Sequence, residues 1–444
     1  MKFRNFGQVS LAILATLAAT IGVSACKQNY TVGYFYVTGV KTGGASGEIG
    51  AFKVNSTNGA LFTIPGQPFS SGGSNPIRVA VDQTGRYIFV LNQGVASTDP
   101  STSNLSYTGN GLAVFSVGGN GTISYQQNYS ASGTDDLRVA EFQGSYLYVL
   151  DKYAPALLPG TQTIANASPT PSAAFPCYDS KDNVYRPVGA ITAFQVNSGT
   201  GVLTLLQNQQ LDGITYFPVG CFPVDMHIAG SVIYTMDAGS STNNDVETVF
   251  PYQVSGANGQ LTITTNGPIA VPGAVDINTI DGDSAGNFVY LLDGATNEIY
   301  AYQPGSNGSL TAISGSPFMN EATVANPDAL YVTGGSAQKF LYLANGSAAA
   351  SLNSPNGAIS YFTIDPSTKT LTPDPPSVIG TGSGPVTILI DPTNQYLYTV
   401  DHISGTVTGR LFNPNTGTLT DLHVTSTYPT VDQPTWGVID GHTD

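Results

Sequence analysis

The sequence predicts an all-β fold, and three observations support this. Only 10% of the 444 residues are Asp, Glu, Lys or Arg, against about 25% in ordinary soluble proteins, while 41% are apolar. The chain also contains 51 Gly and 28 Pro, the residues most typical of turns. Short runs rich in aromatic and β-branched residues recur along it, as strands do. The chain can therefore bury a large core divided by many turns.

The first 25 residues predict an export signal. Lys2 and Arg4 precede an apolar stretch of 15 residues from Val9 to Val23, shorter than the roughly 18 that a membrane-spanning helix needs. The stretch ends before Ser24-Ala25-Cys26, which resembles a bacterial lipobox, although a plain secretory signal with a chance Cys is the alternative. We expect 1–25 to be a lipoprotein signal peptide and 26–32 a lipidated tether. The protein is then held to a membrane of the bacterial cell envelope, on the periplasmic or surface side, through lipid on Cys26.

Two further cysteines, Cys177 and Cys221, remain after Cys26 is lipidated. An even pair in an oxidising compartment predicts one disulfide, and two free thiols are the alternative.

A repeat of about 55 residues organises the rest of the chain, and such periods indicate repeat architectures. One strand-like run recurs seven times with an aromatic residue at its third position: Phe35, Phe89, Tyr148, Tyr234, Tyr290, Tyr342 and Tyr398. Asn-Gly pairs, a strong hairpin signal, follow later in several repeats: Asn58-Gly59, Asn120-Gly121, Asn258-Gly259 and Asn307-Gly308. These runs are predicted to be antiparallel strands.

Each repeat supplies four such strands, and seven four-stranded repeats predict a seven-bladed β-propeller. The first repeat lacks its first strand, whereas the C-terminal segment 433–440, QPTWGVID, is a first strand with nothing after it. We expect this strand to complete the first blade and close the ring. Residues 33–444 are then one propeller, with a long loop insertion at 152–188.

The blade motifs resemble those of the lactonase-type seven-bladed propellers. The shared features are a P-x-x-x-x-x-D strand, a Y-[IL]-[YF]-V strand and an N-G-x-L turn, and the family includes bacterial 6-phosphogluconolactonase and fungal muconate-lactonizing enzymes. The resemblance implies a lactonase, a hydrolase of cyclic esters. Members often carry P-H in the first strand and D-x-G-x-D-R after the second. Here no His follows those prolines, and the segment Asp401 to Gly405, with His402, matches the second motif only in part, without its Arg.

The first strands of a propeller line its central channel, and they carry the candidate site. When they are aligned on their proline, Arg78, Arg138, Asp225 and Trp436 stand near the channel mouth, with His227 two residues beyond Asp225. Two guanidiniums could hold a carboxylate or sugar acid, with His227 and Asp225 as acid and base. The alternative is that Asp225 pairs with an Arg of the next blade and His227 is a core histidine.

Other polar patterns are interpreted as structural. Asp or Asn fills one column at the end of the aromatic strand in six repeats, where such side chains bond the local backbone. The segment Asp281-Gly282-Asp283 is predicted to be a turn rather than a calcium loop, because Ala285 and Leu292 stand where oxygen ligands are needed. No pattern suggests a metal site or a cofactor. A net charge of −15 argues against a nucleic-acid partner.

Two functions remain open. The first is a monomeric, lipid-anchored propeller that binds a small acidic or sugar-like ligand, or a protein partner, at its channel mouth and long loops, with Arg78, Arg138, Trp436 and His402 as candidate contacts. The alternative is a lactonase-like hydrolase of a sugar-acid lactone, in which Arg78 and Arg138 hold the carboxylate and His227 activates water.

Overall fold

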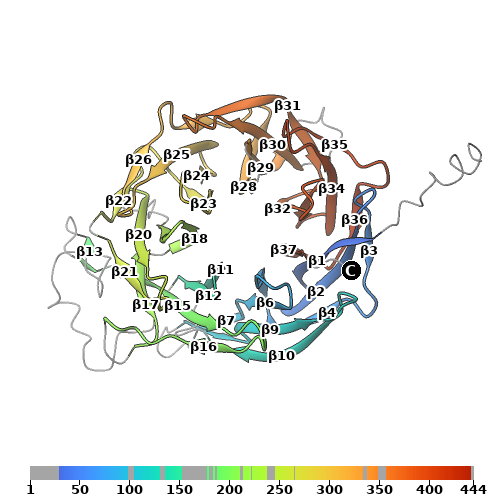
Figure 1. Ribbon diagram of the computed structural model, residues 1–444, viewed down its shortest axis with the longest axis horizontal. Helices are drawn as coiled ribbons and strands as arrows, with labels where there is room; N and C mark the ends of the chain where they lie inside the picture. The colour runs from blue at the N-terminus through green and yellow to red at the C-terminus, as the bar shows by residue number, and fades with distance from the viewer. Residues whose placement is uncertain are drawn as a thin grey trace, which may run out of the picture.

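A computed structural model describes residues 30–98, 105–130, 136–152, 178–179, 184–185, 188–210, 214–221, 223–237, 246–264, 266–333, 338–348 and 357–441. These residues form seven antiparallel sheets arranged as blades around a central channel (Figure 1). The predicted seven-bladed propeller is therefore confirmed.

Each blade has four principal strands, which follow one another from the channel outward. Blade 1 is β37 (Pro434–Asp440), β1 (Thr31–Val40), β2 (Ser46–Asn55) and β3 (Leu61–Thr63). Blade 2 is β5 (Pro76–Val81), β6 (Tyr87–Asn92), β9 (Gly111–Val117) and β10 (Ile123–Tyr129). Blade 3 is β11 (Leu137–Gln143), β12 (Tyr146–Asp151), β15 (Val188–Val196) and β16 (Leu203–Leu205). Blade 4 is β18 (Pro223–Ala229), β19 (Val232–Asp237), β20 (Thr248–Val254) and β21 (Leu261–Ile263).

The remaining blades have the same strand order. Blade 5 is β23 (Ile277–Gly282), β24 (Val289–Asp293), β25 (Glu298–Pro304) and β26 (Leu310–Ala312). Blade 6 is β28 (Val324–Val332), β29 (Lys339–Ala348), β30 (Gly357–Ile364) and β31 (Leu371–Thr381). Blade 7 is β32 (Pro385–Ile390), β33 (Tyr396–Asp401), β34 (Thr406–Phe412) and β35 (Leu419–Asp421).

Short additional strands lie in the connections between these principal strands. Five of them pair with the third strand of their blade: β4 (Phe69–Ser74), β17 (Phe217–Cys221), β22 (Ile269–Ala270), β27 (Phe318–Met319) and β36 (Thr427–Pro429). In blade 1 this third strand is β2, because β37 takes the first place. Two small hairpins are formed by β7 (Val95–Thr98) with β8 (Leu105–Thr108), and by β13 (Tyr178–Asp179) with β14 (Val184–Tyr185).

The C-terminal strand closes the ring as predicted. β37 pairs antiparallel with β1, bringing Trp436 opposite Thr38. The hydroxyl groups of Thr38 and Thr435 lie 3.0 Å apart although 397 residues separate them in sequence. Each channel strand also contacts the channel strand of the next blade, all the way round from β37 through β5 to β32. The first and the last strand of the described residues are thus joined within one sheet (Figure 1).

The core is divided among the blade interfaces. Among the described residues, seven large apolar clusters each draw from two neighbouring blades. Because both faces of a blade are covered, the second strands are buried along almost their whole length, as in β19 and β33. A strand buried on both faces has no solvent side for charged residues, and the low charged fraction follows from this.

Buried tyrosines of the second strands link neighbouring blades. Tyr148 Oη donates to the carbonyl of Gly259 at 3.1 Å, and Tyr398 Oη donates to that of Gly59 at 2.7 Å. Both glycines end Asn-Gly turns and have φ near +69° and +68°. The strand register places Tyr36, rather than the predicted Phe35, in this aromatic column, because Tyr36 pairs with Val438 of β37.

Some predictions lie outside the described residues. Residues 1–29, with Cys26, and residues 153–177, with Cys177, are among them, so the signal peptide, the lipidation and the disulfide stay predictions. Cys221 ends β17, where its backbone pairs with Val188 directly after the long 152–188 connection. Within the described part of the chain, no helix has the length and apolar character needed to cross a membrane.

Candidate functional site

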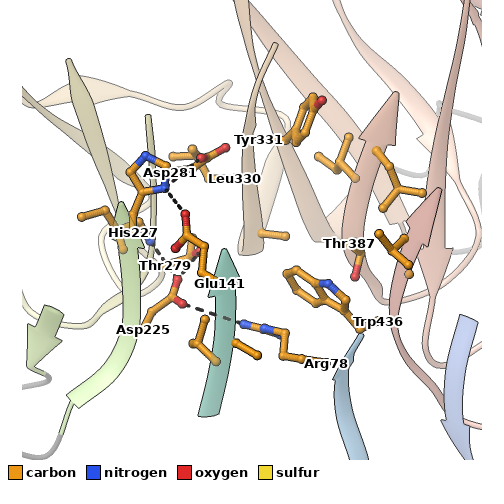
Figure 2. Close-up of a pocket in the computed structure, with 18 of the residues that line it drawn as sticks. Arg78, Glu141, Asp225, His227, Thr279, Asp281, Leu330, Tyr331, Thr387 and Trp436 are labelled. Atoms are coloured by element: carbon orange, nitrogen blue, oxygen red, sulfur yellow. Dashed lines mark hydrogen bonds and ion pairs between the residues drawn. The ribbon is translucent and has the colours of Figure 1, made fainter. Parts of the chain in front are cut away.

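A cavity of about 370 Å³ lies in the central channel. All seven channel strands contribute to its wall (Figure 2). Its volume falls in the range of about 300 to 1,000 Å³ that is usual for small-molecule sites. The first strand of a blade is the inner edge of its sheet, and side chains alternate along a strand, so every second residue of each channel strand faces this space.

The strand register divides the channel-facing residues into two levels. Each channel strand has one irregular step in its pairing with the second strand of its blade. In six blades this step directly follows the first pair of the channel strand, as after Pro76 opposite Asn92 and after Pro223 opposite Asp237; in blade 6 it follows Pro327. The first level consists of the residues that follow the residue before the irregular step by two positions: Arg78, Val139, Asp225, Thr279, Ala329, Thr387 and Trp436. The second level consists of the residues that follow the same starting residue by four positions: Ala80, Glu141, His227, Asp281, Tyr331, Leu389 and Val438.

The second level brings Glu141, His227 and Asp281 together from three consecutive blades. His227 Nδ1 lies 3.5 Å from Glu141 Oε1 and 3.4 Å from Asp281 Oδ1 (Figure 2). Each carboxylate also accepts a backbone N–H of the following channel strand, Glu141 from Ile228 at 3.2 Å and Asp281 from Val332 at 2.8 Å. These bonds hold the two carboxyl groups against the imidazole.

Burial shifts the pKa of every member of this cluster. Desolvation raises the pKa of Glu141 to about 8, helped by the charges of Asp281 and Asp225 and opposed by the Ile228 hydrogen bond. Desolvation likewise raises the pKa of Asp281 to about 7 and lowers that of His227 to about 4. Channel solvent still reaches 28% of the Glu141 side chain and 24% of the Asp281 side chain. Two carboxyl groups therefore exchange protons near neutral pH beside a neutral imidazole, and such groups are typical of acid–base sites.

His227 itself is poorly placed to meet a substrate. Its side chain is 10% exposed, and Nε2 is buried without a hydrogen-bond partner among the described residues. Because Nδ1 faces the two carboxylates, neither ring nitrogen is free to activate water in the cavity. The prediction that His227 acts as the base is therefore replaced by one in which it positions Glu141 and Asp281.

Arg78 and Asp225 occupy the first level. Arg78 Nη2 lies 4.0 Å from Asp225 Oδ1, and the Arg78 guanidinium stacks on Trp436, with Cζ 3.5 Å from the ring centroid. Asp225 Oδ2 accepts hydrogen bonds from Thr279 Oγ1 and from the Ile280 N–H, both at 3.0 Å. Asp225 thus pairs across the channel with an Arg two blades away rather than with one of the next blade, and the Arg78 side chain remains 23% exposed to the channel.

Two predicted site residues lie elsewhere. Arg138 does not line the cavity but pairs with Asp136 at 2.5 Å, because it lies one residue before the channel-facing Val139. A pair of guanidiniums around one ligand is thus absent from the described cavity wall. His402 lies in the connection after β33, where its Nδ1 is 2.9 Å from the Pro434 carbonyl, and it does not line the cavity either.

Glu141 and Asp281 are the site residues that the alignment of the repeats missed. Blade 3 begins its channel strand with Leu137 and blade 5 with Ile277, so neither has the proline used to align the others. In the alignment on proline, the predicted channel-facing positions therefore lie one residue too early in blade 3 and two residues too early in blade 5. Alignment on the Asp or Asn column of the second strands, present in six blades including blades 3 and 5, would find both residues, because Asp151 pairs with Leu137 and Asp293 pairs with Ile277. Asp281 is also not part of the turn, which begins after β23 with Asp283.

The cavity wall has a polar and an apolar side. Arg78, Glu141, Asp225, His227 and Asp281 come from blades 2 to 5, whereas Tyr331, Leu389, Trp436 and Val438 come from blades 6, 7 and 1. Tyr331 and Trp436 lie across the cavity from His227 and Asp225 (Figure 2). Among the residues that the structure describes, no group of three or more His, Cys, Asp or Glu is placed to hold a metal ion.

Comparison with known proteins agrees with this architecture. The family described as "Lactonase, 7-bladed beta-propeller" matches residues 355–437, which span the outer strands of blade 6, all of blade 7 and the first part of the closing strand β37. The predicted resemblance to the lactonase-type propellers is confirmed. No curated protein matches the chain.

Solved lactonase-type structures superpose over nearly the whole chain. A putative 6-phosphogluconolactonase from Bacteroides fragilis is 15% identical with a TM-score of 0.61, covering 94% of this chain and 99% of its own. One from Bacteroides uniformis is 14% identical with a TM-score of 0.63, covering 93% and 100%. The periplasmic gluconolactonase PpgL of Pseudomonas aeruginosa is 15% identical with a TM-score of 0.59, covering 93% and 99%. At these identities the likeness establishes the fold.

Proposed function

We propose that this protein is a lactonase-type hydrolase that opens a lactone ring in the central channel. The observation that carries the proposal is the convergence of Glu141 and Asp281 on His227, with carboxyl pKa values of about 8 and 7, in a cavity of ligand size. The chain is poor in charged residues, yet Arg78 and three carboxyl groups line this one space. The lactonase family resemblance supports the same chemistry, and it favours the hydrolase over the binding module.

The two carboxyl groups suit the two proton transfers of ester hydrolysis. Asp281, with the lower pKa, removes a proton from water as its oxygen attacks the lactone carbonyl carbon. Arg78 stabilises the negative charge that develops on the carbonyl oxygen. The ring C–O bond then breaks, and Glu141, which is protonated at neutral pH, gives its proton to the departing ring oxygen. The product is the open-chain hydroxy acid.

A panel of lactones assayed with purified protein tests this proposal, after subtraction of spontaneous hydrolysis. We expect turnover that falls by at least about 100-fold in Glu141→Gln and in Asp281→Asn, the range usual for loss of acid–base catalysis. Asp401→Asn is the matched control. Asp401 is a buried carboxylate outside the cavity, and two other blades carry Asn in its column, Asn92 and Asn345. Absence of turnover with every lactone, or equal activity of all four proteins, would reject the proposal.

A binding role on the loop-rich face is the second candidate. This face carries the connections from second to third strands and those from one blade to the next. Six of the large exposed apolar side chains of the described residues lie in such connections: Val95, Val246, Val275, Met319, Ile403 and Val424. Apolar side chains gathered on one face favour contact with a protein partner. If lactones are not turned over, cross-linking from this face in the intact cell tests the role, and loss of the cross-linked product in Ile403→Asp would support it.

We also propose that the protein is anchored in the cell envelope through lipid on Cys26, because the apolar stretch from Val9 to Val23 ends at Ser24-Ala25-Cys26. Metabolic labelling with a radioactive fatty acid tests this. We expect a labelled membrane-bound protein and an unlabelled Cys26→Ser variant.

A further inference from the structure

We propose that the cavity takes an uncharged lactone and discriminates against lactones that carry a phosphate or a carboxylate. This inference rests on the proposed lactonase function and narrows its substrate class. It differs from the phosphorylated substrate for which two of the similar proteins are named.

The charge of the cavity wall is the first argument. Its lining includes three carboxyl groups, those of Glu141, Asp225 and Asp281, against the single guanidinium of Arg78. Burial keeps His227 neutral, since its pKa is lowered to about 4. In the active form Glu141 is protonated, but Asp225 and ionised Asp281 still outnumber Arg78. A phosphate dianion placed here would therefore meet more negative than positive charges in a space where water screens them poorly.

The engagement of the one cation is the second argument. The Arg78 guanidinium has Asp225 4.0 Å from one nitrogen and the Trp436 ring against its face. A phosphate or carboxylate ligand is best held by the two parallel N–H groups of a free guanidinium edge, often with a second cation. Asp225 already shares the charge of Arg78, so a phosphate or carboxylate of the ligand would have to compete with Asp225 for it.

The nearby cations are also committed to other partners. Arg138 pairs with Asp136 outside the cavity lining. Lys339 Nζ lies 3.3 Å from Oδ1 of Asp283, two residues beyond Asp281 in the chain, and does not line the cavity. Neither residue is therefore available to hold a ligand phosphate.

The opposite wall is suited to the carbon side of a neutral ring. Tyr331, Leu389, Trp436 and Val438 present an apolar and aromatic surface to the cavity. Tyr331 and Trp436 lie across the cavity from His227 and Asp225 (Figure 2). A sugar-like lactone has hydroxyl groups that suit the carboxylates and a C–H face that suits aromatic and aliphatic side chains. An uncharged hydroxylated lactone is complementary to both walls at once.

The test compares glucono-1,5-lactone with its 6-phosphate as substrates of the wild-type protein. We expect kcat/KM for the uncharged lactone to exceed that for the phosphate by about 100-fold, which corresponds to about 2.7 kcal/mol of transition-state discrimination. A ratio below about 10-fold would overturn the inference while leaving the lactonase proposal intact.

Two variants test the physical reason. Asp225→Asn removes the carboxylate that balances Arg78 and should lower the ratio at least about 10-fold, whereas Asp401→Asn should leave it unchanged. Arg78→Gln should weaken the turnover of both lactones and keep their ratio. A selective loss of phosphate turnover in Arg78→Gln would show that Arg78 holds the phosphate, and that result would overturn the inference even if Asp225→Asn fails to fold.

If neither lactone is turned over, the proposed function fails and titration calorimetry with unreactive ligands decides the inference. Binding of 1,5-anhydroglucitol, with no binding of glucitol 6-phosphate, would support it. Tighter or equal binding of the phosphate, or no binding of either compound, would overturn it.

Discussion

Replacement of Glu141 by Gln is expected to change how the stability of the protein depends on pH. The carboxyl pKa is raised from 4.5 to about 8 in the folded protein, chiefly by desolvation. The folded state therefore favours the protonated form. Its contribution to stability is fully present below pH 4.5 and is lost as the pH rises to about 8. A glutamine is neutral throughout, so this loss is absent in the variant.

The rise in the pKa of Glu141 sets the size of the stability difference between the variant and the wild type. About 3.5 pKa units at 1.36 kcal/mol each give a ceiling of roughly 5 kcal/mol. Because 28% of the side chain is reached by channel solvent, which screens the charge, we expect about 2 to 4 kcal/mol. The free energy of unfolding of Glu141→Gln minus that of wild type should therefore increase by this amount as the pH rises from about 4.5 to about 8.5.

Urea denaturation at a series of pH values measures this difference. Glu321→Gln, the same replacement at a glutamate outside the cavity, controls for the chemical change itself. For Asp281→Asn, the free energy of unfolding relative to wild type should also increase with pH, but over a lower pH range, from 3.8 to about 7. A difference between Glu141→Gln and wild type that stays constant within about 0.5 kcal/mol across the range would refute the reasoning, since it would mean that Glu141 ionises equally in the folded and unfolded chains.

Two further predictions concern the fold. Tyr148→Phe removes the hydroxyl that donates to Gly259 and leaves a buried carbonyl without that donor, so urea denaturation should show a loss of about 1 to 3 kcal/mol; no change would mean that the blades are not linked by this bond. Truncation after Thr430 removes β37, and with it the inner strand of blade 1 and one wall of the cavity. Its thermal unfolding, followed by circular dichroism, should show no cooperative transition, and a melting curve like that of the full chain would contradict the closure of the ring by β37.

Most of the architecture could be predicted from the sequence because each blade repeats the same local signals. Asn-Gly turns, aromatic second strands and the unmatched C-terminal strand fix the number of blades and their closure. The aromatic column was misplaced by one residue in blade 1, where β1 carries Tyr34, Phe35 and Tyr36 in succession and periodicity cannot choose among them. Strand pairing, which is a long-range property, makes the choice.

The site could be predicted only in part. Arg78, Asp225, His227 and Trp436 were found because their strands begin with proline, whereas Glu141 was missed because blade 3 lacks that marker. A slip of one residue reverses which face of a strand a side chain occupies, so the alignment chose Arg138 in place of the neighbouring Val139. The pairing of Arg78 with Asp225 also depends on distances across the channel, which no single repeat encodes.

The pairing of β37 with β1 leaves one strand edge uncovered during synthesis. The ribosome makes β1 some 400 residues before β37, so the inner edge of β1 stays unpaired while the chain between them is added. An uncovered strand edge is a template for pairing with other chains. The cavity is completed equally late, because Trp436 belongs to β37 and Arg78 cannot stack on its ring before β37 is made. A nascent chain therefore carries an exposed strand edge and an incomplete cavity, and both conditions end with one event, the docking of β37.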